Sequence, residues 1–170
     1  MKKVIYFALS ALFLVSCGKA KEEKQETETE AKQPEEYSVV IEAVYEKDDS
    51  ISVVFQQNGF FQYEKAISKK VTGGPGLQRI EMLLPKGETL QNVGYMVSTN
   101  KQQEGISIKN ISILENGNVV LDGSAGKFPQ YFSFDQSFKW DEKTQRYLLT
   151  HTNKYPPGLV GNDKFLQMFN

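Results

Sequence analysis

The chain has one cysteine, one histidine and one tryptophan among its 170 residues. The single cysteine, Cys17, excludes an intramolecular disulfide and a cysteine-based zinc site. Any Ser-His-Asp or Cys-His site would have to use His151, and the sequence contains no nucleophile-elbow motif and no phosphate-binding Gly-Lys-Ser/Thr loop. We therefore predict a protein that is not an enzyme and holds no metal or cofactor, with His151 as a strand residue whose ring is satisfied.

Most of the chain also has no excess of positive or negative charge. Residues 37–170 carry fourteen basic and fourteen acidic side chains, so this part is neutral. A neutral domain lacks the electrostatic footprint of a nucleic-acid-binding protein, and we expect no nucleic-acid partner. Four aspartates offer oxygen atoms to Ca²⁺, but without EF-hand spacing we interpret them as solvated turn carboxylates. These are Asp48, Asp49, Asp135 and Asp141.

No apolar run is long enough to span a bilayer, which takes about 20 residues. The run Val4 to Val15 follows two lysines and precedes small residues, which is typical of a secretory signal. Its last residues, Leu14-Val15-Ser16-Cys17, resemble the bacterial lipoprotein box. The resemblance implies that the signal peptide 1–16 is removed, that the Cys17 sulfur carries a diacylglyceryl group, and that the new amino terminus is acylated, for example with palmitate. An ordinary signal peptide with a chance cysteine is the alternative.

The residues after Cys17 bear on location. Gly18 stands where an Asp would signal inner-membrane retention, which favours the outer membrane. Lys21-Glu22-Glu23 resembles the export signal of Bacteroidetes surface lipoproteins, although a plain hydrophilic linker would look the same. Residues 17–36 have no aromatic or branched aliphatic side chain, so we predict a disordered charged tether behind the lipidated cysteine. We expect a lipid anchor in the outer membrane and leave the periplasmic and surface leaflets open.

Residues 37–170 are long enough for one domain, and their pattern is short period-two runs between turn residues. Asn58-Gly59 and Asn116-Gly117 predict tight hairpin turns. We predict an all-β fold, an antiparallel β-sandwich of jelly-roll type, with a barrel as the alternative. A short C-terminal helix should begin after Asn162, which is a suitable capping residue. The first strand, over 37–46, should bury Tyr37, Val39, Ile41, Ala43 and Tyr45 on one face.

One strand carries a slip in its alternation. Ile106 and Ile108 share one parity, whereas Ile111 and Ile113 share the opposite parity. A β-bulge near Lys109-Asn110 would direct all four side chains to the core, because the extra residue restores the alternation.

The order of features from Phe55 onward resembles the galactose-binding-like β-sandwich of many Bacteroidetes surface and polysaccharide-related proteins. The resemblance implies the sandwich fold. It does not carry over a sugar site, because Gly94 and Met96 stand where that family often has an Arg-x-Asp pair. The matching stretches are Phe55-Gln56, Gln78 to Pro85, Leu90 to Val97 and Ile106 to Ile113.

Aromatic side chains give the remaining functional signal. Tyr131, Trp140, Tyr147 and Tyr155 fall in the last third of the chain. Exposed aromatic rings can stack on sugar rings, although core packing is the alternative for the same residues. If 138–140 pairs with 146–150, then Trp140 beside its charged turn has Asp141, Tyr131 and Gln130 as neighbours. We predict these four residues as the ligand-binding set.

These observations predict a non-catalytic cell-envelope lipoprotein whose sandwich displays a binding surface, with carbohydrate as the expected ligand. Its partners would be the membrane, through the lipid on Cys17, and a glycan. One alternative is a structural or assembly lipoprotein that contacts an envelope protein. Another is a small hydrolase that uses convergent acids or His151 in a deep pocket. An exposed aromatic row in a shallow groove favours the first function, and a large flat apolar patch favours the second.

Overall fold

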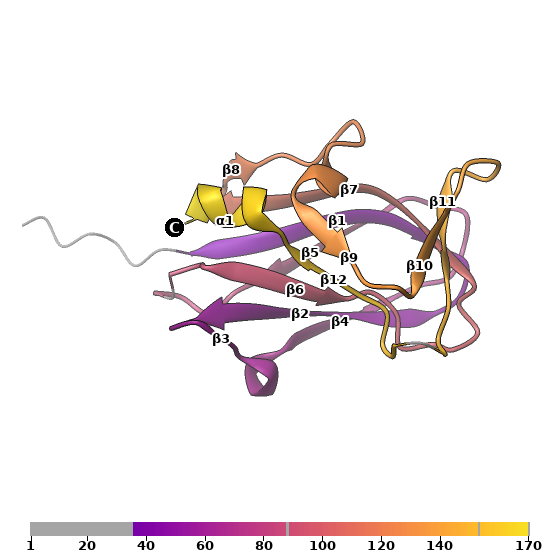
Figure 1. Ribbon diagram of the computed structural model, residues 1–170, viewed down its shortest axis with the longest axis horizontal. Helices are drawn as coiled ribbons and strands as arrows, with labels where there is room; N and C mark the ends of the chain where they lie inside the picture. Colours follow the sequence, from indigo (N-terminus) through magenta and orange to yellow (C-terminus); the bar gives the residue numbers. More distant parts are fainter. Residues whose placement is uncertain (1–35, 88, 153, 170) are drawn as a thin grey trace, which may run out of the picture. The chain divides into compact units, whose positions relative to one another are not determined.

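The computed structural model describes residues 36–87, 89–152 and 154–169. In that part of the chain two antiparallel sheets pack face to face, and one short helix lies near the C-terminus (Figure 1). The predicted all-β sandwich is therefore confirmed. The signal peptide, Cys17 and nearly all of the tether lie outside the described residues, so those interpretations stay predictions. None of the described helices is long and apolar enough to cross a membrane.

The first sheet has the strand order β10-β11-β7-β1-β5, and β8 pairs with β7. Strand β1 lies between β5 and β7, so the predicted first strand is central in this sheet. The bounds are β1 Tyr37–Tyr45, β5 Gln78–Leu83, β7 Gly105–Glu115, β8 Asn118–Leu121, β10 Phe138–Asp141 and β11 Arg146–Leu149.

The second sheet has the order β3-β2-β6-β12-β9, and β4 pairs with β2. Its strands are β2 Asp49–Gln57, β3 Phe60–Phe61, β4 Ile67–Val71, β6 Asn92–Met96, β9 Phe132–Phe134 and β12 Gly158–Gly161. The short helical elements are η1 Tyr63–Lys65, η2 Phe128–Gln130 and α1 Asp163–Phe169.

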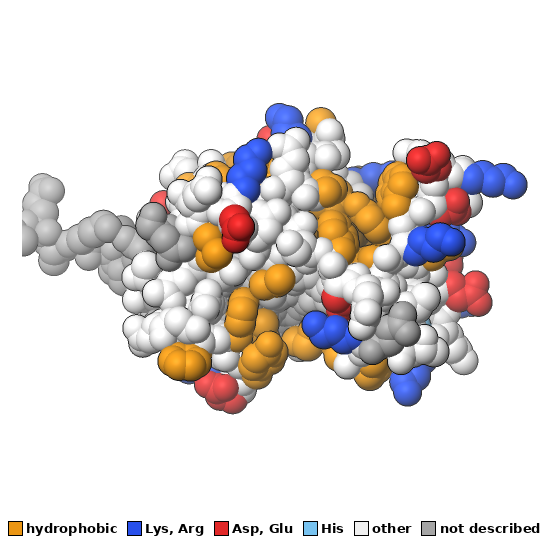
Figure 2. All heavy atoms as spheres, viewed as in Figure 1, with side chains coloured by type: hydrophobic (Ala, Val, Ile, Leu, Met, Phe, Trp, Pro, Cys, Tyr) orange, Lys and Arg blue, Asp and Glu red, His pale blue; other side chains and the backbone are white. Residues whose placement is uncertain are grey.

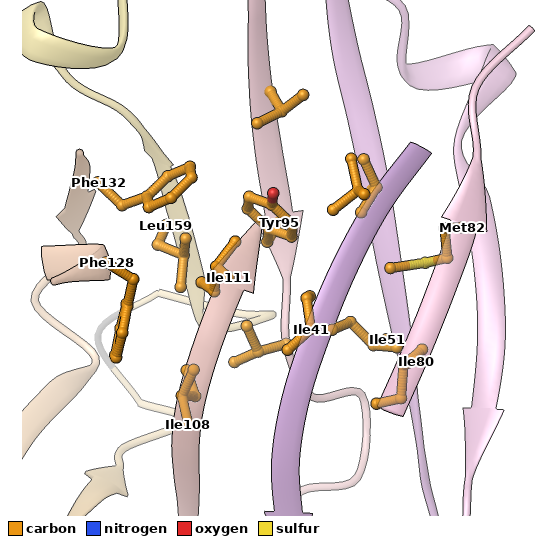
Figure 3. Packing of buried hydrophobic residues seen from close by; sticks show 14 of the residues in the cluster. Ile41, Ile51, Ile80, Met82, Tyr95, Ile108, Ile111, Phe128, Phe132 and Leu159 are labelled. Atoms are coloured by element: carbon orange, nitrogen blue, oxygen red, sulfur yellow. The ribbon is translucent and has the colours of Figure 1, made fainter. Parts of the chain in front are cut away.

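The core lies between the two sheets, where alternate side chains of each strand meet (Figure 3). In β1 all five predicted core residues are buried. Ile41 and Ile111 approach from the first sheet, and Ile51, Tyr95 and Leu159 approach from the second. This burial is the main favourable contribution to folding, since apolar area removed from water is worth roughly 25 cal/mol per Å².

The predicted bulge is present in β7. Glu42 pairs with Asn110 and Ala43 pairs with Ile108, so Lys109 is the extra residue between them. Because of this residue, all four isoleucines of the strand are buried despite their opposite parities; Ile108, the most exposed of them, is 6% exposed.

The predicted turns and the helix cap are also confirmed. Asn58 and Gly59 have φ values of 50° and 81°, and Asn116 and Gly117 have 49° and 80°, as tight hairpin turns of this type require. Asn162 Oδ1 accepts the Lys164 amide at 3.0 Å, which caps α1.

Two strands were not predicted, and two local predictions need correction. No element was predicted where β4 and β12 lie, because β4 has few apolar residues and β12 consists of two aliphatic residues between two glycines. The pattern of Phe60 to Tyr63 predicts a short strand, but only Phe60–Phe61 forms one, and the chain then turns into η1. His151 lies beyond the end of β11 rather than in a strand, and its Nε2 is 2.9 Å from the Gln103 carbonyl oxygen, whereas its buried Nδ1 has no partner among the described residues.

Two buried tyrosines of the core make a matched pair for a stability test. Tyr45 Oη donates to the Val97 carbonyl at 2.9 Å, whereas Tyr95 Oη has no partner among the described residues. Burial raises the pKa of both hydroxyls, so both are neutral at neutral pH. Since a buried polar group without a partner costs about 1–3 kcal/mol, Tyr95→Phe should raise the free energy of unfolding and Tyr45→Phe should lower it by about 1 kcal/mol. Denaturant unfolding measures both, and equal losses would contradict the assignment.

Candidate functional site

A hollow lies on the outer face of the second sheet, the face turned away from the core. Four residues form a row across it, because Val54 pairs with Gly94, Gly94 with Val160, and Val160 with Ser133. Their neighbours in each strand are buried toward the first sheet, so the row points outward. Figure 2 shows this face hollowed near its centre. We call this hollow, of about 320 Å³, the outer groove.

Glycine makes the floor of the outer groove low. A Cβ atom on Gly94 would lie 3.1 Å from Val54 Cγ2 and 3.5 Å from the Phe61 ring. A Cβ atom on Gly158 would lie 2.8 Å from the Tyr95 carbonyl oxygen. A side chain at either position would therefore collide with the sheet or fill the groove.

One wall of the outer groove comes from β3 and η1. The Phe61 ring lies over the floor, and the Tyr63 ring follows it with the two ring centroids 6.2 Å apart. Tyr63 is 66% exposed, so most of its ring is open to solvent. The turn is closed by backbone hydrogen bonds, from the Lys65 amide to the Gln62 carbonyl and from the Ala66 amide to the Tyr63 carbonyl. The wall thus presents an aromatic surface on a defined turn.

Another part of the lining is formed by Lys154, Tyr155 and Pro156, just before β12. Tyr155 is 46% exposed, and its hydroxyl donates to the Thr99 carbonyl at 2.7 Å. The Ser137 hydroxyl donates to the Lys154 carbonyl at 2.9 Å. These hydrogen bonds hold the 154–155 segment in place, so a second aromatic residue lines the groove in a defined position.

The polar end of the outer groove is built around Asp135. Its two carboxylate oxygens each accept a backbone amide at 2.8 Å, one from Ser137 and one from Gly158. Lys154 Nζ lies 3.8 Å from Asp135 Oδ2. A carboxylate has about four lone-pair sites, so Asp135 can still accept hydrogen bonds from a ligand. The lining is mostly apolar with a few placed polar groups, as is typical of small-molecule sites of about 300–1,000 Å³.

The described residues contain no cluster of three or more His, Cys, Asp or Glu side chains suited to a metal ion. Our interpretation of Asp49 as a solvated turn carboxylate is wrong. Asp49 is 8% exposed and lies at the start of β2, facing the residues that follow β6. It accepts hydrogen bonds there from Ser98 Oγ at 2.6 Å and from the Thr99 and Asn100 amides at 2.8 and 2.9 Å.

The predicted pairing of the last hairpin is confirmed, because β10 and β11 pair with Trp140 opposite Tyr147. The two rings are 4.9 Å apart, and Trp140 is 44% exposed. Both rings line a second hollow of about 500 Å³ that we call the edge hollow, together with Ile108, Lys109, Gly126, Phe128, Pro129 and Gln145. Burial raises the pKa of the Tyr147 hydroxyl, so it is a neutral donor at neutral pH.

The other three predicted residues have different surroundings. Asp141 lies in the hairpin turn, where it accepts the Thr144 hydroxyl and the Lys143 amide. Lys164 of α1 donates to Gln130 Oε1 at 2.8 Å, and the same ammonium group lies 4.8 Å from the centre of the Tyr131 ring. The structure therefore places the predicted set at two locations, one at the β10–β11 hairpin and one beside α1.

Sequence reasoning missed the outer groove. Phe61, Tyr63 and Lys154 were not singled out, and Tyr155 was considered only as a member of the aromatic cluster. Asp135 was interpreted as a solvated turn carboxylate, which is wrong, because its side chain is only 12% exposed and accepts two backbone amides. One signal for the outer groove was present, since a glycine inside a strand, such as Gly94, often marks a place that a ligand or another chain segment approaches closely.

We compared the chain with protein-family models, with curated proteins and with solved structures, and none of these comparisons finds a match. The lipoprotein box and the galactose-binding-like pattern are therefore predictions from the sequence. The function proposed below is inferred from the geometry of the described residues.

Proposed function

We propose that this chain is a non-catalytic, lipid-anchored envelope protein whose outer groove binds carbohydrate. The observation that carries the proposal is that Tyr63 and Tyr155, two exposed aromatic residues from distant parts of the chain, line one groove with a glycine floor. An exposed aromatic pair in a hollow favours a sugar over a flat protein partner.

The chemistry of the outer groove suits a sugar ring. A pyranose has apolar C–H faces and a rim of hydroxyl groups, so it needs an aromatic surface together with polar groups at the edge. Tyr63 and Tyr155 supply the aromatic surface. Asp135 accepts hydrogen bonds, Lys154 donates them, and the exposed Ser133 hydroxyl can do both.

The charges of the outer groove favour a neutral sugar. Asp135 and Lys154 are the charged residues among those that line it, and they lie 3.8 Å apart with opposite signs. An acidic sugar would have to separate this pair and approach Asp135, and a basic sugar would have to approach Lys154. We therefore assign neutral hexoses and N-acetylhexosamines as the ligand class.

Tyr63→Ala should weaken binding of a neutral glycan about tenfold, which corresponds to ~1.4 kcal/mol, because it removes the exposed ring from one wall. The measurement is retention of the full chain, in detergent, on an array of gluco-, galacto-, manno- and N-acetylglucosamine oligosaccharides. Phe60→Ala is the matched control, since Phe60 is 75% exposed in the same hairpin but does not line the groove. This control should bind like the wild type.

Two results would reject the carbohydrate proposal. The first is a wild-type chain that the array does not retain, and the second is equal binding by Tyr63→Ala and Phe60→Ala. If the wild-type chain instead co-purified with an envelope protein through the same face, the assembly function would replace the carbohydrate function.

The anchor is the second part of the proposal and is supported by the box that ends at Cys17. Two or more acyl chains give stable membrane attachment, because each buried methylene contributes about 0.8 kcal/mol. Cys17→Ser should therefore move the protein from the outer-membrane fraction to the soluble fraction, or leave the signal peptide uncleaved. Fractionation and acyl labelling measure this, and an unchanged acylated product would contradict it.

A further inference from the structure

We propose that the ligand is an oligosaccharide that extends from the outer groove over the edge hollow, with one of its sugars packed on Trp140. This inference rests on the proposed function of the outer groove. It adds a second subsite and specifies the ligand as a chain of several sugars rather than a single sugar.

The two hollows are joined by a continuous row of aromatic contacts. Phe134 lines the outer groove, and its ring stacks on that of Tyr147 with centroids 4.8 Å apart and an angle of 20° between the planes. Tyr147 in turn contacts Trp140 at 4.9 Å. Figure 2 shows hydrophobic side chains beside the central hollow, over the region between β9 and the β10–β11 hairpin of Figure 1. One lining residue of the outer groove, Phe134, is thus in direct contact with one lining residue of the edge hollow, Tyr147, so the two hollows are neighbours.

The position of Trp140 in the sandwich explains why its ring is open. Trp140 pairs with Tyr147, and Tyr147 pairs with the buried Ile106, so all three side chains lie on the inner face of the first sheet. Among residues 36–169, apart from 88 and 153, β9 is the edge strand of the second sheet, and no strand of that sheet lies beyond it to cover Trp140. A tryptophan that only filled the core would be buried there, but this one is 44% exposed.

The edge hollow has the composition of a sugar subsite. Trp140 and Tyr147 give an aromatic surface, and Lys109 and Gln145 line the hollow with groups that can bond hydroxyls. Lys109 is the extra residue of the β7 bulge, so the bulge places it at this rim. We choose a glycan that extends from the groove as the occupant because Tyr147 of the hollow stacks on Phe134 of the groove and because the hollow offers the same two kinds of contact.

The single tryptophan of the chain provides a direct test, because its fluorescence reports on the edge hollow alone. The full chain in detergent is titrated with the dimer and the hexamer of three series: α-1,4-linked glucose, β-1,4-linked glucose and β-1,4-linked N-acetylglucosamine. We expect one series to bind, with the hexamer at least tenfold tighter than the dimer. The hexamer should shift the emission of Trp140, whereas the dimer should bind without a shift.

Variants separate the two subsites. Trp140→Ala should reduce the affinity for the hexamer to that for the dimer and leave the dimer unchanged, and Trp140→Phe should restore most of the loss. Tyr63→Ala should weaken both oligomers. Affinities are measured by calorimetry, and thermal unfolding of each variant shows that it is folded.

Equal affinity of dimer and hexamer, or an unshifted emission on hexamer binding, would overturn the second subsite and leave the proposed function in place. These two results come from the wild-type chain and hold even if Trp140→Ala fails to fold. Binding of neither oligomer in any of the three series would overturn the second subsite, and the proposed function falls with it if the array of gluco-, galacto-, manno- and N-acetylglucosamine oligosaccharides also retains nothing.

Discussion

Asp49→Ala is expected to lower the free energy of unfolding by about 3–5 kcal/mol, because it leaves one buried and three partly buried hydrogen-bond donors without an acceptor. The Asp49 carboxylate accepts the Ser50, Thr99 and Asn100 amides and the Ser98 hydroxyl, all within 2.9 Å. It thereby joins the start of β2 to the residues that follow β6. Denaturant unfolding of the variant and the wild type measures the loss.

Two further variants serve as an intermediate case and as a control for the stability loss expected at Asp49→Ala. Asp49→Asn keeps one acceptor oxygen and should lose about half as much stability, whereas Glu142→Ala in the exposed hairpin turn should change stability by less than about 0.5 kcal/mol. A loss at Asp49→Ala no larger than at Glu142→Ala would contradict the role of Asp49. The Thr99 carbonyl also holds the Tyr155 hydroxyl, so Asp49→Ala should weaken glycan binding as well.

The second large effect concerns the bulged strand. Ile108→Ala and Ile111→Ala should each cost about 2–5 kcal/mol, because each removes most of a buried side chain and leaves a cavity. The two residues have opposite parity, so in a regular strand one of them would face solvent. In the structure both are buried, since Lys109 is the additional residue between them.

The bulge residue itself is the control for this pair. Lys109 is exposed, so Lys109→Ala should change the free energy of unfolding by less than about 0.5 kcal/mol. A severe effect at one isoleucine and none at the other would mean that the strand is regular and that one of them faces out. Denaturant unfolding of all three variants decides between the two arrangements.

Local alternation predicted much of the sandwich correctly because the burial of a strand residue depends on its parity. The first strand and the slip at Lys109 are cases in which the pattern and the position of the side chains agree. The turns at Asn58 and Asn116 were equally predictable, since Asn-Gly tolerates the positive φ that they adopt. Strand β12 could not be predicted, because Leu159 and Val160 between two glycines give too short a pattern.

The outer groove depends on contacts between distant parts of the chain, which alternation does not contain. Tyr63 precedes β4 and Tyr155 precedes β12, and they line the same hollow only because β12 pairs with β6, which pairs with β2. Asp135 belongs to the groove for the same reason, since its carboxylate accepts the amide of Gly158. Because β12 was not predicted from the sequence, the proximity of these residues could not be predicted either.

The structure agrees with one part of the predicted ligand-binding set around Trp140. The hairpin that holds Trp140 and Asp141 forms as expected, because 138–140 and 146–149 alternate and flank a polar turn. Gln130 and Tyr131 have another partner in Lys164, which a sequence pattern cannot show because α1 reaches them only through the fold.

The most direct measurement is a map of backbone amide chemical shifts during titration with the neutral oligosaccharide that the array retains best. If the outer groove is the binding site, the amides of Gly94, Ser133, Asp135 and Val160 should shift together and saturate with the same affinity. The amide chemical shifts of β1, which lies in the other sheet, should not change. Shifts confined to β1 and its neighbours, or saturable binding that leaves the four groove amides unmoved, would contradict the account.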